Sequence, residues 1–259
     1  MDAYLERYEL FGWDYPYLNP LADKEIAWYT KFARRTGGPV LELACGTARL
    51  LIAIARAGYT VEGIDLSPNM INIASERVSG MPSEVASRIL LHRADMTDFQ
   101  LDRHFGLVII VDNSFRELKT RKQQLSCLKC VHRHLRSGGK LLVAVRRSET
   151  PGFSGDQRMP EWSEPVSHPV THDSVERKVV SEFSQDGKWA VTVYYYKTRH
   201  KDGSETVGKL VSEAPVMSMD DYSSLFSEAG FSANALINYE EQADDGKNLI
   251  ICFVCDRLL

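Results

Sequence analysis

Apolar positions between residues 39 and 147 form short continuous runs that alternate with longer amphipathic stretches. The runs predict buried strands, at 40–43, 59–64, 89–93, 105–111 and 140–145. The amphipathic stretches predict helices, at 48–57, 67–78 and 117–135. Ser67 is expected to cap the second of these helices, with Pro68 at its first position. Strands and helices that alternate at this spacing are typical of an α/β fold with a doubly wound parallel sheet.

The segment before this core is rich in aromatic residues. Residues 4–18 contain six of them, and residues 21–35 follow with the spacing of a helix. Aromatic rings suit a cationic group, so we expect Tyr15 and Tyr17 to belong to a lid that closes over a ligand. The alternative is that these rings only pack the N-terminal segment onto the domain.

After the core, apolar and polar residues alternate one by one, which is the pattern of half-buried strands. Residues 148–169 are rich in proline, glycine, serine and glutamate, and three alternating segments follow, at 174–183, 188–199 and 205–215. Aspartate–glycine pairs between these segments predict an antiparallel meander. Both faces of its middle segment are half apolar, so we expect one face to cover the active site and the other to pack on a neighbouring segment or on a second subunit in a homodimer. A helix at 218–229 and strands at 231–239 and 248–255 complete the pattern.

Composition and charge narrow the class of protein. The chain has 259 residues and a net charge of −4, which gives no general attraction to nucleic acid. No apolar run is long enough to span a membrane, and the first residues lack the pattern of a signal peptide. Five cysteines, an odd number, indicate a reducing compartment. These features predict a cytoplasmic enzyme.

Three acidic residues fall at equivalent places in the predicted sheet. Glu42 lies within the first strand, and Asp65 and Asp95 end the second and third. Neighbouring parallel strands end at one edge of a sheet, where ligands of such folds bind. Asp65 follows the glycine turn by about twenty residues, where an acid can accept both ribose hydroxyls.

A nicotinamide dinucleotide is the first candidate ligand. Its fingerprint requires glycines that let the backbone approach a pyrophosphate, but this chain has Gly46, Ala48 and Leu51 at those positions. Two of the three glycines are missing, and Glu42 would lie close to the diphosphate. An NAD-linked oxidoreductase is therefore disfavoured.

The same residues resemble class I S-adenosylmethionine-dependent methyltransferases, in particular those that act on small molecules. Residues 42–49 (ELACGTAR) resemble the first motif of that family, with Ala48 where a glycine is usual. Residues 63–70 (GIDLSPNM) resemble the second motif, and residues 94–96 (ADM) the third. The resemblance implies S-adenosylmethionine as cofactor and a Rossmann-like, mostly parallel seven-stranded sheet that ends in an antiparallel hairpin. It is strong over residues 39–147 and weak elsewhere.

The resemblance also implies roles for individual residues. Ala44, Gly46 and Thr47 would approach the methionine part of the cofactor, and Glu42 would orient the turn and the amino group. Asp65 would hold the ribose, while Leu66 and Met70 would flank the adenine. Asp95 would accept from the exocyclic amine and Met96 would meet the ring. Arg49 would bind the carboxylate or else lie on the helix surface. The cofactor-binding set predicted in this way is Glu42, Ala44, Gly46, Thr47, Arg49, Asp65, Leu66, Met70, Asp95, Met96 and Asp112.

The fourth strand leads into Asp112-Asn113-Ser114-Phe115, where the acceptor is expected to bind. Methyltransferases that act on DNA, RNA or protein glutamine carry two prolines at this place, and both are absent here. Asn113 and Phe115, with Arg146 from the fifth strand, are therefore predicted to bind a small substrate, with nitrogen slightly preferred over oxygen as acceptor. No catalytic residue is assigned, although a hydroxyl acceptor would need a base. His168 and His172 are the candidate bases, with solvated loop positions as the alternative.

No metal site is predicted. The two C-x-x-C pairs lie within a helix and within a strand, where their sulfurs do not converge on one ion. His132 and His134 are read as surface residues. We expect one domain, with an N-terminal lid at 1–38, a cofactor core at 39–147, an insertion at 148–216 and a C-terminal helix and hairpin at 217–259. A non-catalytic cofactor-binding protein on the same scaffold is the alternative to an enzyme.

Overall fold

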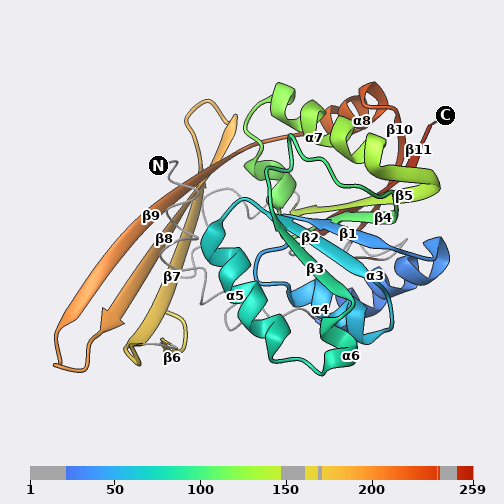
Figure 1. The fold of residues 1–259 in the computed structure, drawn as a ribbon. Coiled ribbons are helices and arrows are strands. Elements are labelled where there is room, and N and C mark those ends of the chain that lie inside the picture. The colour runs from blue at the N-terminus through green and yellow to red at the C-terminus, as the bar shows by residue number, and fades with distance from the viewer. Residues whose placement is uncertain (1–21, 147–160, 169–170, 238, 240–249, 259) are drawn as a thin grey trace.

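The computed structural model describes residues 22–146, 161–168, 171–237, 239 and 250–258. Seven strands form one sheet in the order β10-β11-β5-β4-β1-β2-β3, and four form a second sheet in the order β6-β7-β8-β9 (Figure 1). The parallel strands of the first sheet are β1 (Val40–Leu43), β2 (Val61–Asp65), β3 (Ile89–Arg93), β4 (Phe105–Ile110) and β5 (Leu135–Arg146). Strand β11 (Ile250–Arg257) lies antiparallel between β5 and β10 (Phe231–Ile237). The predicted α/β fold, with its mostly parallel seven-stranded sheet and antiparallel end, is confirmed.

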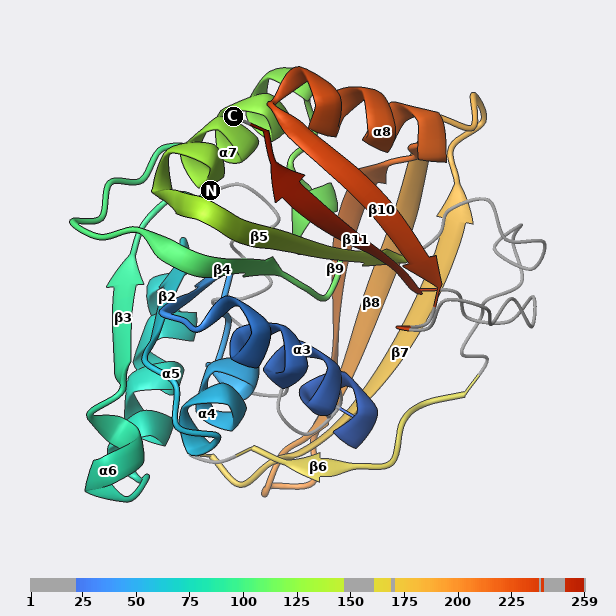
Figure 2. The same cartoon turned by 90° about the vertical axis from the view of Figure 1, so that its right-hand side faces the viewer.

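Helices cover both faces of this sheet (Figure 2). On one face lie α3 (Asp23–Thr36), α4 (Arg49–Arg56), α5 (Pro68–Ser79) and the short α6 (Ser83–Ala86). On the other face lie α7 (Arg121–His134) and α8 (Met219–Glu228). Side chains alternate across β1, so Val40 packs with α3 and α4 while Leu41 and Leu43 pack with α7 and α8. None of the helices in the described part of the chain has the length and apolar character of a membrane span.

Local signals explain where several elements begin. Ser67 Oγ accepts a hydrogen bond of 3.1 Å from the amide of Met70, so the predicted cap of α5 is confirmed. The long helix expected from residue 117 begins at Arg121 instead. A 3-10 helix, η2 (Ser114–Glu117), comes first, and Thr120 then forms a capping box with Gln123.

His134 is buried, and its reading as a surface residue was wrong. Only 3% of the residue is exposed, and its ring stacks on Phe99 with centroids 4.5 Å apart. Its Nε2 accepts from the amide of Leu101 at 3.0 Å. The histidine therefore fastens the end of α7 to the loop after β3.

The second sheet is the predicted meander. Strands β7 (Ser174–Phe183), β8 (Trp189–Arg199) and β9 (Glu205–Pro215) pair antiparallel, and β6 (Val166–Ser167) adds a short edge that the pattern did not predict. Val175, Tyr196 and Leu210 are buried together on one face, against the half-buried Ile73 of α5. This sheet therefore packs beside α5, alongside the core domain (Figure 1).

Candidate active site

The turn between β1 and α4 has a left-handed backbone at three residues. The φ angles are +54° at Ala44, +54° at Gly46 and +60° at Ala48. Glycine adopts this conformation freely, whereas an L-residue pays about 1–2 kcal/mol. Two alanines therefore hold strained conformations at the entrance of α4. Strain of this kind persists where a ligand site requires the geometry.

Asp65 holds this turn from the neighbouring strand. Its Oδ2 accepts from the amide of Gly46 at 2.8 Å, and its Oδ1 accepts from the amide of Ser67 at 2.9 Å. Its backbone oxygen accepts from the amide of Ala94, at the end of β3, at 3.1 Å. Asp65 thus joins the ends of β1, β2 and β3. A carboxylate has about four lone-pair sites, so it can also accept from a ligand.

Glu42 lies beneath the turn with an unsatisfied oxygen. Only 3% of the residue is exposed, and its Oε2 has no hydrogen-bond partner. Burial raises the pKa of Glu42 well above its usual range, and Asp112 raises it further, while Arg49 opposes them. Buried polar atoms in proteins almost always have a partner. The orphaned oxygen therefore suits a ligand that brings an ammonium or N–H group.

The turn after β4 is also strained and is tied down at two points. The φ angles are +54° at Asp112 and +66° at Asn113, both in the left-handed region. Asp112 forms an ion pair with Arg49, and Asn113 Oδ1 accepts from the amide of Arg146. Burial raises the pKa of Asp112, and Arg49 opposes this shift. Arg49 is thus paired within the chain, and its contact with a ligand carboxylate stays a prediction.

The residues predicted to surround an adenine differ in how much of their surface is exposed. Leu66 is 39% exposed, whereas Met70 is 2% exposed and presents almost no surface to a ligand. Asp95 is exposed, and its Oδ1 accepts from the amide and hydroxyl of Thr97, which leaves Oδ2 outside these two bonds. Met96 is half-buried and packs against the core under α7. Leu66 and Asp95 are thus the most available to a ligand.

Two residues predicted to contact a ligand are buried and have partners within the chain. Thr47 is 1% exposed, and its hydroxyl and carbonyl oxygens accept from Arg77 of α5, at 3.0 and 2.6 Å. Phe115 is fully buried and stacks on Phe226 of α8, with ring centroids 6.2 Å apart. Phe115 is therefore packed in the core, and its contact with a substrate stays a prediction. The predicted lid residues Tyr15 and Tyr17 lie outside the described residues.

Sequence reasoning missed residues that α3 and η2 bring toward the acceptor turn. Tyr29 of α3 is 1% exposed, and its ring centroid lies 5.9 Å from that of Tyr239. Burial raises its pKa well above the usual range, the neighbouring Tyr239 contributes next, and Asp112 contributes as well. Arg116 of η2 is 4% exposed, with its Nε unpartnered and one terminal nitrogen donating to the Pro215 oxygen at 3.2 Å. The helical spacing of residues 21–35 accounts for Tyr29 as a packing residue, and only the structure shows that it is buried near Asp112.

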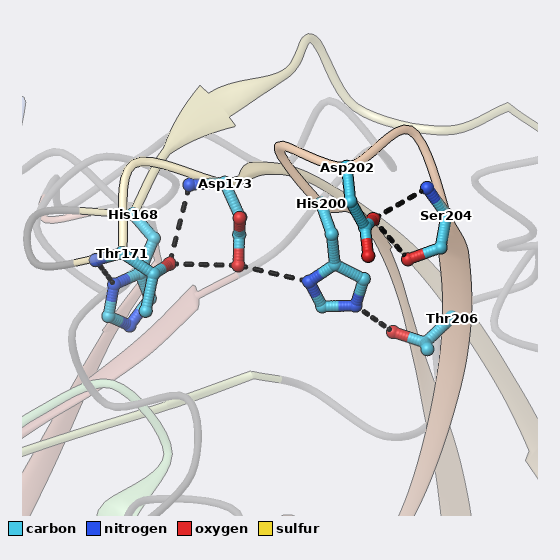
Figure 3. A network of polar contacts seen from close by, with 7 residues as sticks. All are labelled: His168, Thr171, Asp173, His200, Asp202, Ser204 and Thr206. Atoms are coloured by element: carbon cyan, nitrogen blue, oxygen red, sulfur yellow. Dashed lines mark hydrogen bonds and ion pairs between the residues drawn. The ribbon is translucent and has the colours of Figure 1, made fainter.

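The candidate bases of the insertion lie in a separate network, at the end of the second sheet near β6 (Figure 3). His168 Nδ1 accepts from the amide of Thr171 at 3.1 Å, and burial lowers the pKa of His168. Asp173 accepts from the hydroxyl of Thr171 at 2.9 Å and contacts His200 Nδ1 at 3.1 Å. These bonds fasten the loop after β6 to the turn between β8 and β9. The bonds named here all join residues of the loop after β6 to one another or to the turn between β8 and β9.

The comparisons with known proteins agree with this geometry. Residues 40–139 match a family described as a methyltransferase domain. A putative methyltransferase of Bacillus subtilis, YqeM, is 37% identical over 112 residues, which are 43% of this chain and 43% of the relative. The match thus spans less than half of that relative's length. A dTDP-3-amino-3,6-dideoxy-alpha-D-glucopyranose N,N-dimethyltransferase of Streptomyces fradiae is 26% identical over 74% of this chain and 69% of its own.

The fold has close counterparts among solved structures. The sugar N-methyltransferase KedS8 from Streptoalloteichus superposes with a TM-score of 0.75 over 97% of this chain and 93% of its own, at 22% identity. The CcbJ methyltransferase from Streptomyces caelestis superposes with a TM-score of 0.73 over 94% and 95%, at 15% identity. The likeness therefore includes the second sheet as well as the core.

Proposed function

The chain carries a methyltransferase domain of the class I S-adenosylmethionine-dependent family, and we propose that it methylates a small molecule, with an amine as acceptor. The observation that carries this proposal is the orphaned Oε2 of Glu42 beneath the left-handed turn after β1. It is a buried carboxyl next to strained backbone with one oxygen left to accept a hydrogen bond, so it suits a ligand that carries an ammonium group.

The described residues fit the cofactor at its two ends. Glu42 would accept from the amino group of the methionine part, and Asp65 would accept from the ribose hydroxyls. Leu66 and Asp95, both exposed at the same edge of the sheet, would contact the adenine. The bound cofactor supplies an electrophilic methyl group on a sulfonium. The chain itself has to align the acceptor with that methyl and keep water away.

The turn after β4 is the part of the chain that would align the acceptor. Asp112 and Asn113 follow a fully buried strand and are held by Arg49 and by the amide of Arg146. Asp112 has a raised pKa and Tyr29 lies near it, so the carboxylate and hydroxyl oxygens there would accept from an ammonium or amine. Asp112 would then hold the proton that an ammonium acceptor loses before its nitrogen attacks.

Two further observations support nitrogen as the acceptor atom, and a third concerns the class of substrate. The Streptomyces fradiae relative and the Streptoalloteichus structure are both named N-methyltransferases. A hydroxyl acceptor would need a stronger base, and the histidines of the insertion hold together the far end of the second sheet. The net charge of −4 gives no support to a nucleic-acid substrate.

The proposal is tested by incubating the purified chain with methyl-labelled S-adenosylmethionine and matched pairs of small amines and alcohols. Each pair shares a carbon skeleton, so that only the acceptor atom differs. We expect labelled product from amines and little from alcohols. Transfer to alcohols alone would contradict the preference for nitrogen. Cofactor binding without transfer to any acceptor would favour a non-catalytic protein on this scaffold.

A further inference from the structure

Arg116 of η2 is a buried cation that forms no ion pair in the described part of the chain. Only 4% of the residue is exposed. One terminal nitrogen donates to the Pro215 oxygen of β9 at 3.2 Å, and Nε has no partner. A guanidinium has five N–H donors and stays protonated in proteins, and a buried charge is normally paired. The unused donors of Arg116 therefore indicate a site for an anion.

Tyr222 of α8 is a second buried donor, and it lies near Arg116. It is 2% exposed, and its hydroxyl has no hydrogen-bond partner among the described residues. Its ring lies near that of Phe115, the residue before Arg116, with centroids 6.5 Å apart. Burial raises the pKa of Tyr222 to about 12, and the nearby charge of Arg116 opposes this shift. The hydroxyl thus stays protonated at neutral pH, and an oxyanion can accept from both side chains.

Arg146, at the end of β5, brings another positive charge to this place. Burial lowers the pKa of Arg116; Tyr222 and Glu117 oppose this shift, and Arg146 lowers the pKa further. Two guanidinium groups that affect each other in this way repel, and an anion near both relieves the repulsion. The amide of Arg146 donates to Asn113 Oδ1, so the same residue fastens the turn after β4. The three side chains therefore lie next to the place where the acceptor would bind.

A structural role alone explains only part of this arrangement. The bond to the Pro215 oxygen fastens η2 to the end of β9, and a clamp of that kind needs one donor. It gives no reason for the orphaned Nε of Arg116 or for the orphaned hydroxyl of Tyr222. Burial of a polar group without a partner is unfavourable, so stability does not account for two such groups at one place.

Arg116 also lies at a suitable distance from the turn after β4. It follows Asn113 by three residues, through a 3-10 helix. Such a helix rises about 2 Å per residue, so the two residues are about 6 Å apart along its axis. An amine at the turn and an anion at Arg116 would thus belong to one small molecule, separated by a few bonds.

We propose that Arg116 and Tyr222, with the added charge of Arg146, bind an anionic group of the acceptor substrate. We call these three residues the anion site. The substrate is then an amine that also carries a carboxylate or a phosphate, and both groups accept paired hydrogen bonds from a planar guanidinium. This inference rests on the proposed transfer to an amine at the turn after β4, and direct anion binding tests it without that transfer.

Methyl transfer to matched amines tests the substrate class. One set pairs primary amino carboxylates with their neutral methylamides, and the other pairs aminoalkyl phosphates with the methyl ethers of the same amino alcohols. We expect kcat/KM to be at least about tenfold higher for the anionic member in one of the sets, the usual effect of a charged hydrogen bond. The set with the larger ratio identifies carboxylate or phosphate. Equal values within every pair would overturn the inference, while the proposed transfer to amines would stand.

Variants of the anion site are compared by the same ratio, in which a general loss of activity cancels. Arg116→Gln keeps a donor for the Pro215 oxygen but loses the charge, and should lower the ratio about tenfold. Tyr222→Phe keeps the ring and should lower it about threefold with an unchanged unfolding midpoint, because only an unpartnered hydroxyl is lost. Arg121→Gln, which removes an exposed ion pair with Glu228, should keep the ratio. An unchanged ratio in both site variants would refute the anion site.

Direct binding of small anions gives a readout that needs no turnover. The unfolding midpoint of the ligand-free chain is measured in inorganic phosphate, in acetate and, at the same ionic strength, in chloride. We expect phosphate or acetate to raise the midpoint of the parent and of Arg121→Gln, but not that of Arg116→Gln. No rise in the parent, or an equal rise in Arg116→Gln, would overturn the anion site. A rise that depends on Arg116, without transfer to any amine, would support the site and contradict the proposed function.

Discussion

Arg49 and Asp112 form an ion pair that ties the turn after β1 to the turn after β4. Arg49 is the first residue of α4, and Asp112 begins the strained pair that continues with Asn113. The two turns are 63 residues apart in the chain. The ion pair therefore joins the part of the site that would hold the cofactor to the part that would align the acceptor.

Breaking this pair should affect turnover more than binding. We expect Arg49→Gln to lower kcat about tenfold, which corresponds to about 1.4 kcal/mol in the barrier. Asp112→Asn should lower it at least as much, because the proposed proton acceptor is lost as well. The reason is that the left-handed Asp112 and Asn113 lose one of their two fastenings and no longer hold the acceptor in line. The KM for the acceptor should change less. Steady-state kinetics provide the measurement, with an amine that the labelled-methyl assay identifies as an acceptor.

A double-mutant cycle gives the control for that prediction. If the two side chains act together, the variant with both substitutions should lose about as much as Asp112→Asn alone. Arg88→Gln removes an exposed ion pair with Glu84 on the far side of the molecule and should change nothing measurable. Fully additive losses at Arg49 and Asp112 would contradict a shared role.

Ala48 should tolerate glycine but not a β-branched residue. Its φ of +60° costs an alanine about 1–2 kcal/mol, and glycine removes this cost. Glycine also loses a buried methyl group, about 0.8 kcal/mol, and has a more flexible unfolded state, so Ala48→Gly should lie within about 1 kcal/mol of the parent. Ala48→Val should lose about 2 kcal/mol or more, because a β-branched residue is a strong outlier here. Urea unfolding measures both, and equal stability of the two variants would contradict this explanation.

Gly63 of β2 is required for space. A Cβ added there would lie 2.4 Å from Leu51 Cδ1 and 2.7 Å from Cys45 Sγ, beneath the turn after β1. Gly63→Ala should therefore lower the free energy of unfolding by about 1–3 kcal/mol, the usual cost of overpacking a core. Gly80→Ala is the matched control, since its nearest contact is an ordinary 3.5 Å to the Arg77 oxygen. Loss at position 80 but not at position 63 would refute the steric explanation.

Glu42 should make the stability of the ligand-free protein depend on pH. Burial raises its pKa in the folded state well above the ordinary value of 4.5. Between these two pKa values the folded state binds more protons than the unfolded state, so stability falls as pH rises above about 4.5. Glu42→Gln removes the carboxyl and with it this pH dependence. The variant should therefore gain stability relative to the parent as pH increases. Denaturant unfolding across the pH range measures the difference, and a constant or opposite difference would disagree with the burial of an unpartnered carboxyl.

Much of the fold follows from periodicity. The strands β1, β3, β7 and β9 have the bounds that the pattern predicts, because each is a clear apolar or alternating run between turn residues. The start of α7 was wrong since Glu117 fits a helical period, and only the capping box at Thr120 shows where the helix begins. β6 and α6 were missed because two-residue and four-residue elements carry no period.

The site could be predicted only in part, for a physical reason. Position in a motif located Glu42 and Asp65 at the ends of neighbouring strands, because parallel strands bring such ends together. The direction in which a side chain points could not be predicted from its position in a motif. Phe115 follows the predicted turn directly, yet the left-handed backbone at Asp112 and Asn113 leads into η2, and the ring lies in the core. Asp and Asn are among the non-glycine residues that most often adopt positive φ, but this preference alone does not say that two of them in a row will do so.

The central claim is that the turn after β1, held by Asp65, binds S-adenosylmethionine. Calorimetric titration of the purified chain with this cofactor tests it most directly, with Asp65→Ala and the surface variant Asp23→Ala titrated alongside. We expect one site per chain, unchanged affinity in Asp23→Ala, and a loss of at least about tenfold in Asp65→Ala, or about 1.4 kcal/mol. A folded parent chain that binds no cofactor, or an Asp65→Ala variant that binds as tightly as the parent, would contradict the account.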